Sequence, residues 1–423
     1  MQQHLQERLT EAPWCTAFPR RYAPQSRRRR ASLSGPRVAL IALACAALLA
    51  MSSCGAAKSS AAPASLKVGL LAALSGTYAA VGKDLRDGFQ LYLDTHNGKL
   101  GGHQIDLVVG DEGDGPATAV PAATKMVKDD HVVALTGVVG GGSVQALVPL
   151  LNQAKIPLVG SNGRPQLKDV AREWHTSFLS DEPGAAIAKY VHDKIPGTVF
   201  AIGPDYQGGY DELRGFTEAF KAAGGQLANK DGKATFTPFP GTTNFMPYFA
   251  QIKASGAKAV YCFYAGTAAV DFVKQYAQSD AKSLPLFAAG FLTEGGVLAA
   301  QGQSARDIYS VLNYSPDLDN AANRTFTAAW RARHDSAPTT YAMASYDAGA
   351  VLDRAIGAAG TNPTPEAINA AIAGIGQIDS PRGSWEFSRN THAPIQKWYL
   401  RQVRPDGRAL SNTVVESLLT LGA

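Results

Sequence analysis

Short apolar runs of strand length alternate with segments of helical spacing over most of this 423-residue chain. The first such unit has apolar runs at 66–73 and 105–110, and between them Leu85, Phe89 and Tyr92 recur at helical spacing. Strands that alternate with helices of about ten to fifteen residues form parallel sheets with helices on both faces. The alternation therefore predicts an α/β fold of doubly wound parallel sheets.

Roughly 360 residues follow the first 65, and a single hydrophobic core stops growing near about 250 to 300 residues. We therefore expect two lobes, each with its own sheet. The pattern predicts these further elements in order: helix 117–128, strand 132–136, helix 144–153, strand 156–159, helix 185–194, strand 198–202, helix 211–223, helix 245–255, strand 259–263, helix 268–278 and strand 286–288.

The N-terminal segment 1–54 reads as an export signal. An apolar run at 38–51 follows the arginines Arg27 to Arg30 and is too short for a membrane anchor, which needs about 20 apolar residues. Ser52 and Ser53 before Cys54 resemble the bacterial lipoprotein processing box, although Met51 stands where that box usually has leucine. We predict a lipid on Cys54, followed by a flexible tether at 55–65. The alternative is an unlipidated signal peptide cut elsewhere in the alanine-rich region.

The charge and the cysteines say little about partners once this segment is removed. Residues 1–54 carry a net charge of +6 and the whole chain carries +5, so residues 55–423 carry −1. This charge does not favour binding to nucleic acid. Cys262 is then the only cysteine besides Cys54, so we expect no disulfide framework.

Three loops rich in glycine and hydroxyl side chains follow predicted strands. In doubly wound sheets, ligands bind at the carboxyl ends of the strands, where small residues let backbone N–H groups approach an anion. These loops contain Ser75, Gly76, Thr77 and Tyr78 after the first strand, Gly140 to Ser143 after the third, and Gly160 to Gly163 after the fourth. Each loop alone could simply form a turn or cap a helix, but together they predict one anion site.

These residues carry a family resemblance. The segment from Val68 to Tyr78, with Gly82 and Gly88, resembles the opening of the leucine/isoleucine/valine-binding proteins, which are type 1 periplasmic solute receptors of ABC importers. Similar blocks recur at 111–112, 154–157, 203–206, 272–275 and 346–348. The resemblance covers nearly all of residues 66–400.

The resemblance implies a fold with two lobes, joined by three crossing segments, that close by a hinge motion over a solute. Lobe 1 would be 66–177 plus 312–382, and lobe 2 would be 178–311 plus 383–423. It further implies a monomer that works with ABC permease and ATPase subunits and reaches the membrane through its N-terminal lipid. The residues that it implies as ligand contacts are Ser75, Thr77, Tyr78, Gly141, Gly142, Ser143, Ser161, Asn162, Gly163, Tyr206, Tyr264, Ala265 and Leu292.

One position departs from the amino-acid binders. The acidic residue that neutralises the ligand's ammonium in that family aligns with Leu292, so either Glu294 reaches the ligand or the ligand has no α-amino group. The segments Gly203–Gly209 and Phe263–Gly266 resemble the branch that binds aromatic acids such as benzoate or cinnamate derivatives. In that branch Tyr78, Tyr206, Phe263, Tyr264 and Phe291 would form flat walls. Aromatic residues near strand ends more often fill the core, and for Phe263 we favour that interpretation.

Catalysis is disfavoured. The chain has no Gly-x-Ser-x-Gly, His-Glu-x-x-His, P-loop or Gly-x-Gly-x-x-Gly motif, so we expect no enzyme, no cofactor and no metal. We expect an extracytoplasmic receptor for a small organic carboxylate, either a branched-chain amino acid or an aromatic acid. The alternative is a solute sensor of the same fold that signals to a membrane regulator.

Overall fold

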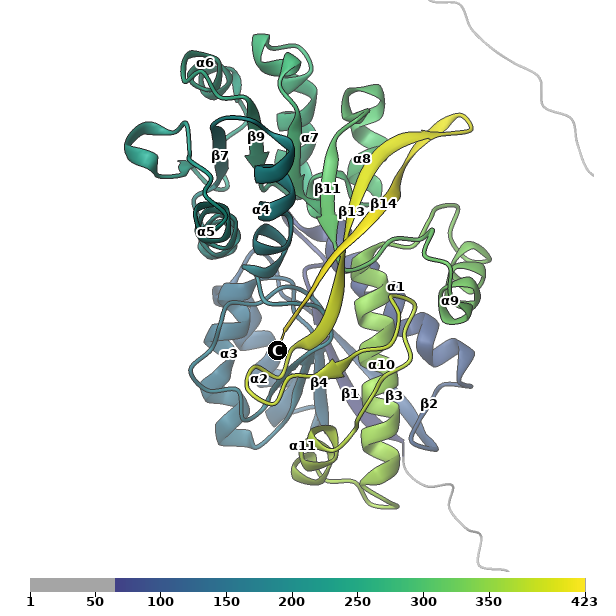
Figure 1. Ribbon diagram of the computed structural model, residues 1–423. Helices are drawn as coiled ribbons and strands as arrows, with labels where there is room; N and C mark the ends of the chain where they lie inside the picture. Colours follow the sequence, from purple (N-terminus) through teal and green to yellow (C-terminus); the bar gives the residue numbers. More distant parts are fainter. Residues whose placement is uncertain (1–64, 423) are drawn as a thin grey trace, which may run out of the picture. The chain divides into compact units, whose positions relative to one another are not determined.

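Two separate β-sheets organise residues 65–422, which are the residues that the computed structural model describes (Figure 1). The predicted export segment 1–54, Cys54 and nearly all of the predicted tether 55–65 lie outside these residues. Among residues 65–422, none of the helices is long and apolar enough to cross a bilayer.

The first sheet has the strand order β2-β3-β1-β4-β5-β6, and all its strands are parallel except β2, which pairs with β3 as a hairpin. Val68, Leu70 and Ala72 of β1 pack on one face with α1 and α10, while Leu71 packs on the other face with α2 and α3. Residues on both faces of β1 are buried, as in a doubly wound sheet. The strands are β1 (Leu66–Ala72), β2 (Lys99–Leu100), β3 (His103–Asp111), β4 (Ala134–Gly137), β5 (Leu158–Gly160) and β6 (Glu173–His175).

The second sheet has the order β12-β13-β11-β10-β9-β7-β8, and β14 also pairs with β13. Strands β7 to β11 are parallel to one another. The strands are β7 (Val199–Pro204), β8 (Thr235–Thr237), β9 (Ala259–Cys262), β10 (Leu286–Ala289), β11 (Tyr309–Leu312), β12 (Glu386–Phe387), β13 (Pro394–Asp406) and β14 (Ala409–Leu421).

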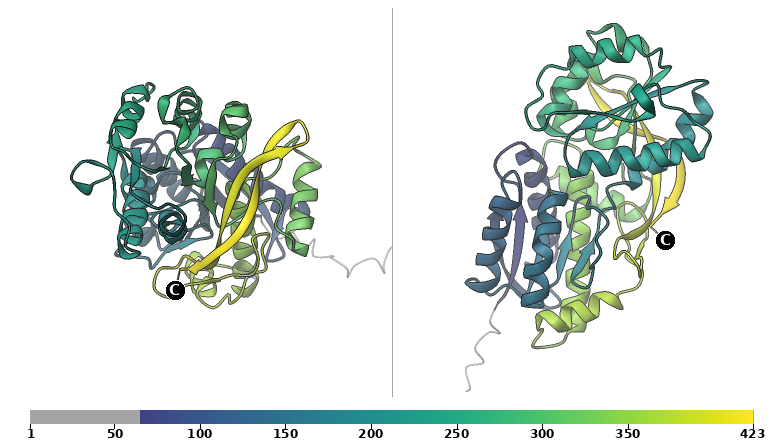
Figure 2. Two further views of the ribbon diagram at one scale, coloured as in Figure 1. Left: turned by 45° about the horizontal axis from the view of Figure 1, so that its top comes forward. Right: turned by 90° about the vertical axis from the view of Figure 1, so that its left-hand side faces the viewer.

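Helices cover both faces of each sheet, so the predicted doubly wound α/β class is confirmed (Figure 2). Helix α10 packs against α1 beside the first sheet although more than two hundred residues separate them. The helices are α1 (Ala79–Thr95), α2 (Pro116–Lys128), α3 (Gly141–Ala154), α4 (Glu182–Lys194), α5 (Gln207–Ala222), α6 (Met246–Ala254), α7 (Gly266–Tyr276), α8 (Gly296–Gln301), α9 (Ala321–Arg331), α10 (Thr340–Ala358) and α11 (Pro365–Ala373).

The second sheet differs from the purely parallel sheet that we predicted, because the long antiparallel hairpin of β13 and β14 completes one edge (yellow in Figure 1). The hairpin turns through Gly407 and Arg408, and Gly407 adopts a φ of +60°. Such two-residue turns need a positive φ, which glycine accepts without strain.

Alternation along β9 and β10 decides which side chains can reach a ligand. Tyr261 and Phe263 belong to the core on the α4 and α5 side, whereas Cys262 and Tyr264 belong to the core on the α6 and α7 side. Successive side chains of a strand point to opposite faces, so neighbouring aromatic residues at the strand end serve different surfaces.

The three predicted crossing points between lobes meet at one carbonyl group. The Ser177 oxygen accepts hydrogen bonds from Gln396 Nε2 at 2.6 Å, from Asn313 Nδ2 at 3.4 Å and from Arg382 Nη1 at 3.4 Å. Arg382 is also ion-paired with Asp347 at 2.7 Å, and both side chains are buried. These contacts tie the crossing segments together; the lobe boundaries at 177, 311 and 382 stay a prediction.

Candidate functional site

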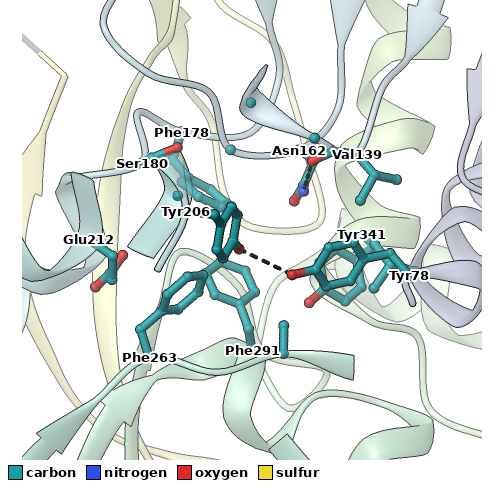
Figure 3. A pocket seen from close by; sticks show the side chains of 16 residues that line it. Tyr78, Val139, Asn162, Phe178, Ser180, Tyr206, Glu212, Phe263, Phe291 and Tyr341 are labelled. Carbon is teal, nitrogen blue, oxygen red and sulfur yellow. Dashed lines mark hydrogen bonds between the residues drawn. The ribbon is translucent and has the colours of Figure 1, made fainter. Parts of the chain in front are cut away.

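A cavity lies where the carboxyl ends of strands from both sheets face each other (Figure 3). In each sheet the strand order reverses there, between β1 and β4 in the first sheet and between β7 and β9 in the second. Open α/β sheets bind ligands at such switch points. The lining residues are Tyr78, Val81, Val139, Gly140, Gly141, Asn162, Gly163, Phe178, Ser180, Tyr206, Gly208, Glu212, Phe263, Ala265, Phe291 and Tyr341.

Four helices begin at this cavity. The residues that precede them, Tyr78 before α1, Gly140 before α3, Tyr206 before α5 and Ala265 before α7, all line it. In none of these four helices does the side chain of the preceding residue cap the first turn. First-turn N–H groups have no partner inside a helix and carry the positive end of its dipole, so the cavity is suited to an anion.

The conformation of the α3 loop is held from behind by a carboxyl group. Glu112 is buried and accepts hydrogen bonds from the N–H groups of Val139 at 2.6 Å and Gly140 at 2.8 Å. This fixes the loop while the following N–H groups of α3 stay without a side-chain cap. Asn162 Nδ2 donates to the Val139 oxygen at 2.7 Å and so joins the loop after β5 to the same structure.

Six aromatic rings wall the cavity: Tyr78, Phe178, Tyr206, Phe263, Phe291 and Tyr341 (Figure 3). Tyr78 Oη donates a hydrogen bond to Tyr206 Oη at 3.3 Å, which bridges the two predicted lobes. The Phe239 ring stacks on both tyrosines, with centroid distances of 4.6 Å to Tyr206 and 6.1 Å to Tyr78. Burial raises the pKa of Tyr78 to about 12, so this hydroxyl stays neutral at physiological pH.

Among residues 65–422, Glu212 is the only acidic residue in the cavity lining, and no lysine or arginine lines it. It lies on α5, is 1% exposed and accepts a hydrogen bond from the Tyr261 hydroxyl. Burial raises the pKa of Glu212 to about 8, against the lowering effect of the Tyr261 hydroxyl. The side chain is therefore largely protonated at neutral pH and adds little negative charge to the site.

Comparisons with known proteins decide the family. The sequence profile described as periplasmic binding protein matches residues 65–408. The chain belongs to the periplasmic binding protein family.

Individual members of the family are similar over most of their length. A Leu/Ile/Val-binding protein homolog of Brucella melitensis is 29% identical over 347 residues, which span 80% of this chain and 87% of that protein. A solute-binding protein of an ABC transporter from R. palustris, solved with benzoate, is 30% identical with a TM-score of 0.77, covering 85% of this chain and 98% of its own. A second one from R. palustris, solved with 4-hydroxybenzoate, is 27% identical with the same TM-score and covers 84% and 97%.

These findings confirm the predicted resemblance to type 1 solute receptors. This periplasmic binding protein is a substrate-binding component of ABC transport, and its family implies an extracytoplasmic location. The matched relatives are receptors rather than enzymes. Among residues 65–422, no group of three His, Cys, Asp or Glu side chains could hold a metal ion.

The structure of this binding protein brings six of the thirteen predicted contact residues into the cavity lining. They come from five different loops, after β1, β4, β5, β7 and β9. The six are Tyr78, Gly141, Asn162, Gly163, Tyr206 and Ala265.

Five other predicted residues belong to the same loops but do not line the cavity. Ser75 donates from Oγ to Asp111 at 2.6 Å, and the Thr77 N–H donates to Asp114 at 2.7 Å, so both stabilise the loop after β1. Gly142, in the first turn of α3, lies just beyond the lining. Ser143 and Ser161 are buried, and their hydroxyl groups have no hydrogen-bond partner in the described structure.

Tyr264 and Leu292 are placed in the core rather than at the cavity. Both are almost fully buried on the α6 and α7 side of the second sheet, and the Tyr264 hydroxyl lies 3.2 Å from Thr237 Oγ1. Their neighbours Phe263 and Phe291 belong to the core on the opposite side of the sheet and line the cavity. Phe263 and Tyr264 continue the alternation of β9, whereas Phe291 and Leu292 lie in a 3-10 turn that follows β10. Glu294, the suggested substitute carboxylate, is instead paired with buried Arg401 at 2.9 Å.

The sequence did not reveal several of the lining residues. Phe178 follows the short strand β6, which was not predicted, and Tyr341 comes from the start of α10, far away along the chain. Glu212 is one helical turn after Gly208, a spacing that places both on one face of α5 and could have signalled its position.

Proposed function

We propose that this protein is the receptor of an ABC importer for a small aromatic carboxylate, which it captures in the cavity between its two lobes. The observation that carries the proposal is the combination of four helix N-termini without side-chain caps and six aromatic side chains around one cavity. The first feature suits the carboxylate and the second suits the ring.

The carboxylate would be held by backbone groups. No lysine or arginine among the described residues lines the cavity, so we assign the negative charge of the ligand to N–H groups at the starts of α3, α5 and α7. Hydrogen bonds to a charged acceptor in a water-poor site contribute about 1.5 to 3 kcal/mol each, enough for a few of them to retain a carboxylate.

The α-amino group of an amino-acid ligand would have few negatively charged partners in the cavity. The family resemblance implies that Leu292 stands where the amino-acid binders have an acidic residue. Glu294 is engaged by Arg401 and by the Thr340 N–H at 2.8 Å. Glu212 is the remaining carboxyl group, and its raised pKa opposes the ionised form that an ammonium needs. This favours the aromatic acids of the R. palustris proteins over the branched-chain amino acids named for the Brucella relatives.

Isothermal titration with matched ligands tests the proposal. We expect benzoate or a hydroxybenzoate to bind with 1:1 stoichiometry and to raise the melting temperature. Benzamide, which has the same shape without the charge, is expected to bind at least tenfold more weakly. Tight binding of leucine or valine with no response to aromatic acids would refute the ligand class.

The remaining features complete the proposal. The lobes would close over the ligand through the crossing segments, and a lipid on Cys54 would hold this monomeric receptor near its permease and ATPase subunits. The alternative is a sensor that signals to a membrane regulator. Two permease genes and two ATPase genes beside the gene for this protein would favour transport, and a histidine kinase gene in their place would favour sensing.

A further inference from the structure

One side of the cavity differs chemically from the rest. Figure 3 shows Glu212 and Ser180 on the side away from Tyr78 and Tyr341, with the rings of Tyr206, Phe263 and Phe291 between the two sides. The rest of the lining is apolar or consists of backbone groups, tyrosine hydroxyls and the Asn162 amide, which donates to the Val139 oxygen. A ligand that places its ring among the aromatic side chains therefore meets a carboxyl group at this side.

The hydrogen-bonding capacity of Glu212 is only partly used. The Tyr261 hydroxyl donates to Oε1, and the Gly184 backbone also donates to this carboxyl group. A protonated carboxyl group has in addition an O–H donor, and it can accept further hydrogen bonds. Both known donors come from the protein core behind α5, so the unused capacity is available on the cavity side.

We infer that Glu212 selects aromatic acids that carry a ring hydroxyl over the unsubstituted acid. This rests on the proposed function, because it assumes that an aromatic carboxylate occupies the cavity. A phenolic hydroxyl can both donate to and accept from a neutral carboxyl group, which neither a methyl group nor a ring hydrogen can do.

The expected selectivity follows from leaving a buried polar group without a partner. When an unsubstituted ring fills the cavity, the remaining hydrogen-bonding capacity of Glu212 has no partner on the ligand, and sites built around such a hydrogen bond reject ligands that lack it. We expect the best monohydroxybenzoate to bind about tenfold or more tightly than benzoate, and also more tightly than the methylbenzoate substituted at the same ring position.

The test measures affinity ratios for the purified full-length chain by isothermal titration with benzoate and with the hydroxy- and methylbenzoates. Glu212→Leu is expected to lower the hydroxybenzoate-to-benzoate ratio to near one. Glu212→Gln keeps the shape of the side chain. Its amide oxygen accepts the hydrogen bond from Tyr261, so its NH₂ group can only donate to the ligand. We expect the hydroxybenzoate-to-benzoate ratio to fall at least threefold. The control is Glu218→Gln, an exposed position on the same helix, which should keep the wild-type ratio.

The outcomes distinguish a failure of the role of Glu212 from a failure of the proposed function. A wild-type ratio near one, with both acids bound, would overturn the role of Glu212 and leave the proposed function standing. A high ratio that survives in both Glu212 variants would also overturn it. If no aromatic acid binds the wild-type chain at all, the proposed function and this inference fail together.

Discussion

The hydrogen bond between Tyr78 and Tyr206 gives a quantitative test of lobe closure. These hydroxyl groups are 3.3 Å apart and belong to the residues just before α1 and α5. With the proposed hinge motion, they would meet only when the two predicted lobes approach each other. Replacing either tyrosine with phenylalanine removes the bond but keeps the ring that stacks on Phe239. Each substitution therefore tests the hydrogen bond between the two hydroxyl groups while the ring packing is kept.

The magnitude follows from the geometry. The bond is neutral, because burial raises the pKa of both hydroxyl groups, and 3.3 Å is longer than the usual 2.7 to 2.8 Å of O–H···O bonds. Its net contribution should lie near the low end of the usual range, at about 0.5 to 1 kcal/mol. If ligand binding requires closure, each single variant should bind the ligand about two- to fivefold more weakly.

A double-mutant cycle by isothermal titration checks the interpretation. Tyr78→Phe and Tyr206→Phe remove the same bond, so the double variant should bind no more weakly than either single variant. Tyr92→Phe is the matched control, since it loses a hydrogen bond to Asp353 that lies away from the cavity, and it should keep the wild-type affinity. Fully additive losses, or single variants with unchanged affinity, would refute the closing role of this bond.

Three further predictions concern the fold and the anchor. Arg382→Met leaves the buried Asp347 carboxylate without its ion pair, so the free energy of unfolding in urea titrations should fall by about 3 to 5 kcal/mol. The control is Arg324→Met, which breaks an exposed ion pair and should change the free energy of unfolding by less than about 1 kcal/mol. Burial raises the pKa of Glu173 from 4.5 to about 8 and so favours its protonated form in the folded state. The free energy of unfolding should therefore fall by a few kcal/mol as the pH rises from about 4.5 to 8. Glu173→Gln should reduce that fall. Cys54→Ala should move the protein from the membrane fraction to the soluble fraction on cell fractionation, and an unchanged membrane fraction would refute the lipid anchor.

Much of the fold was predictable because the spacing of apolar residues along the chain indicates local helices and strands. The predicted strand 66–73 and helix 117–128 match β1 and α2 to within a residue at each end. The β13 and β14 hairpin was not predicted, although Asp406 and Gly407 between two alternating segments form a recognisable turn signal. Its place at the edge of the second sheet depends on pairing with β11, which no local pattern specifies.

The candidate site was predictable where it depends on strand ends and not where it depends on side-chain direction. Gly141, Asn162 and Tyr206 follow strands directly, so the rule for parallel sheets finds them. Tyr264 was expected at the cavity, but a shift of one residue along a strand turns a side chain to the other face. Leu292 was also expected there, but it lies in a 3-10 turn after β10, whose side-chain directions the strand pattern does not give. Phe178 and Tyr341 reach the cavity through tertiary packing, which sequence spacing alone does not give.

The most direct test of the central claim is a crystal structure of the protein with the hydroxybenzoate or benzoate that binds best. The account predicts the ligand's carboxylate within hydrogen-bond distance of backbone N–H groups at the starts of α3, α5 or α7, and its ring among Tyr206, Phe263 and Phe291. A carboxylate paired with an arginine or lysine side chain, or a ligand bound outside this cavity, would contradict it.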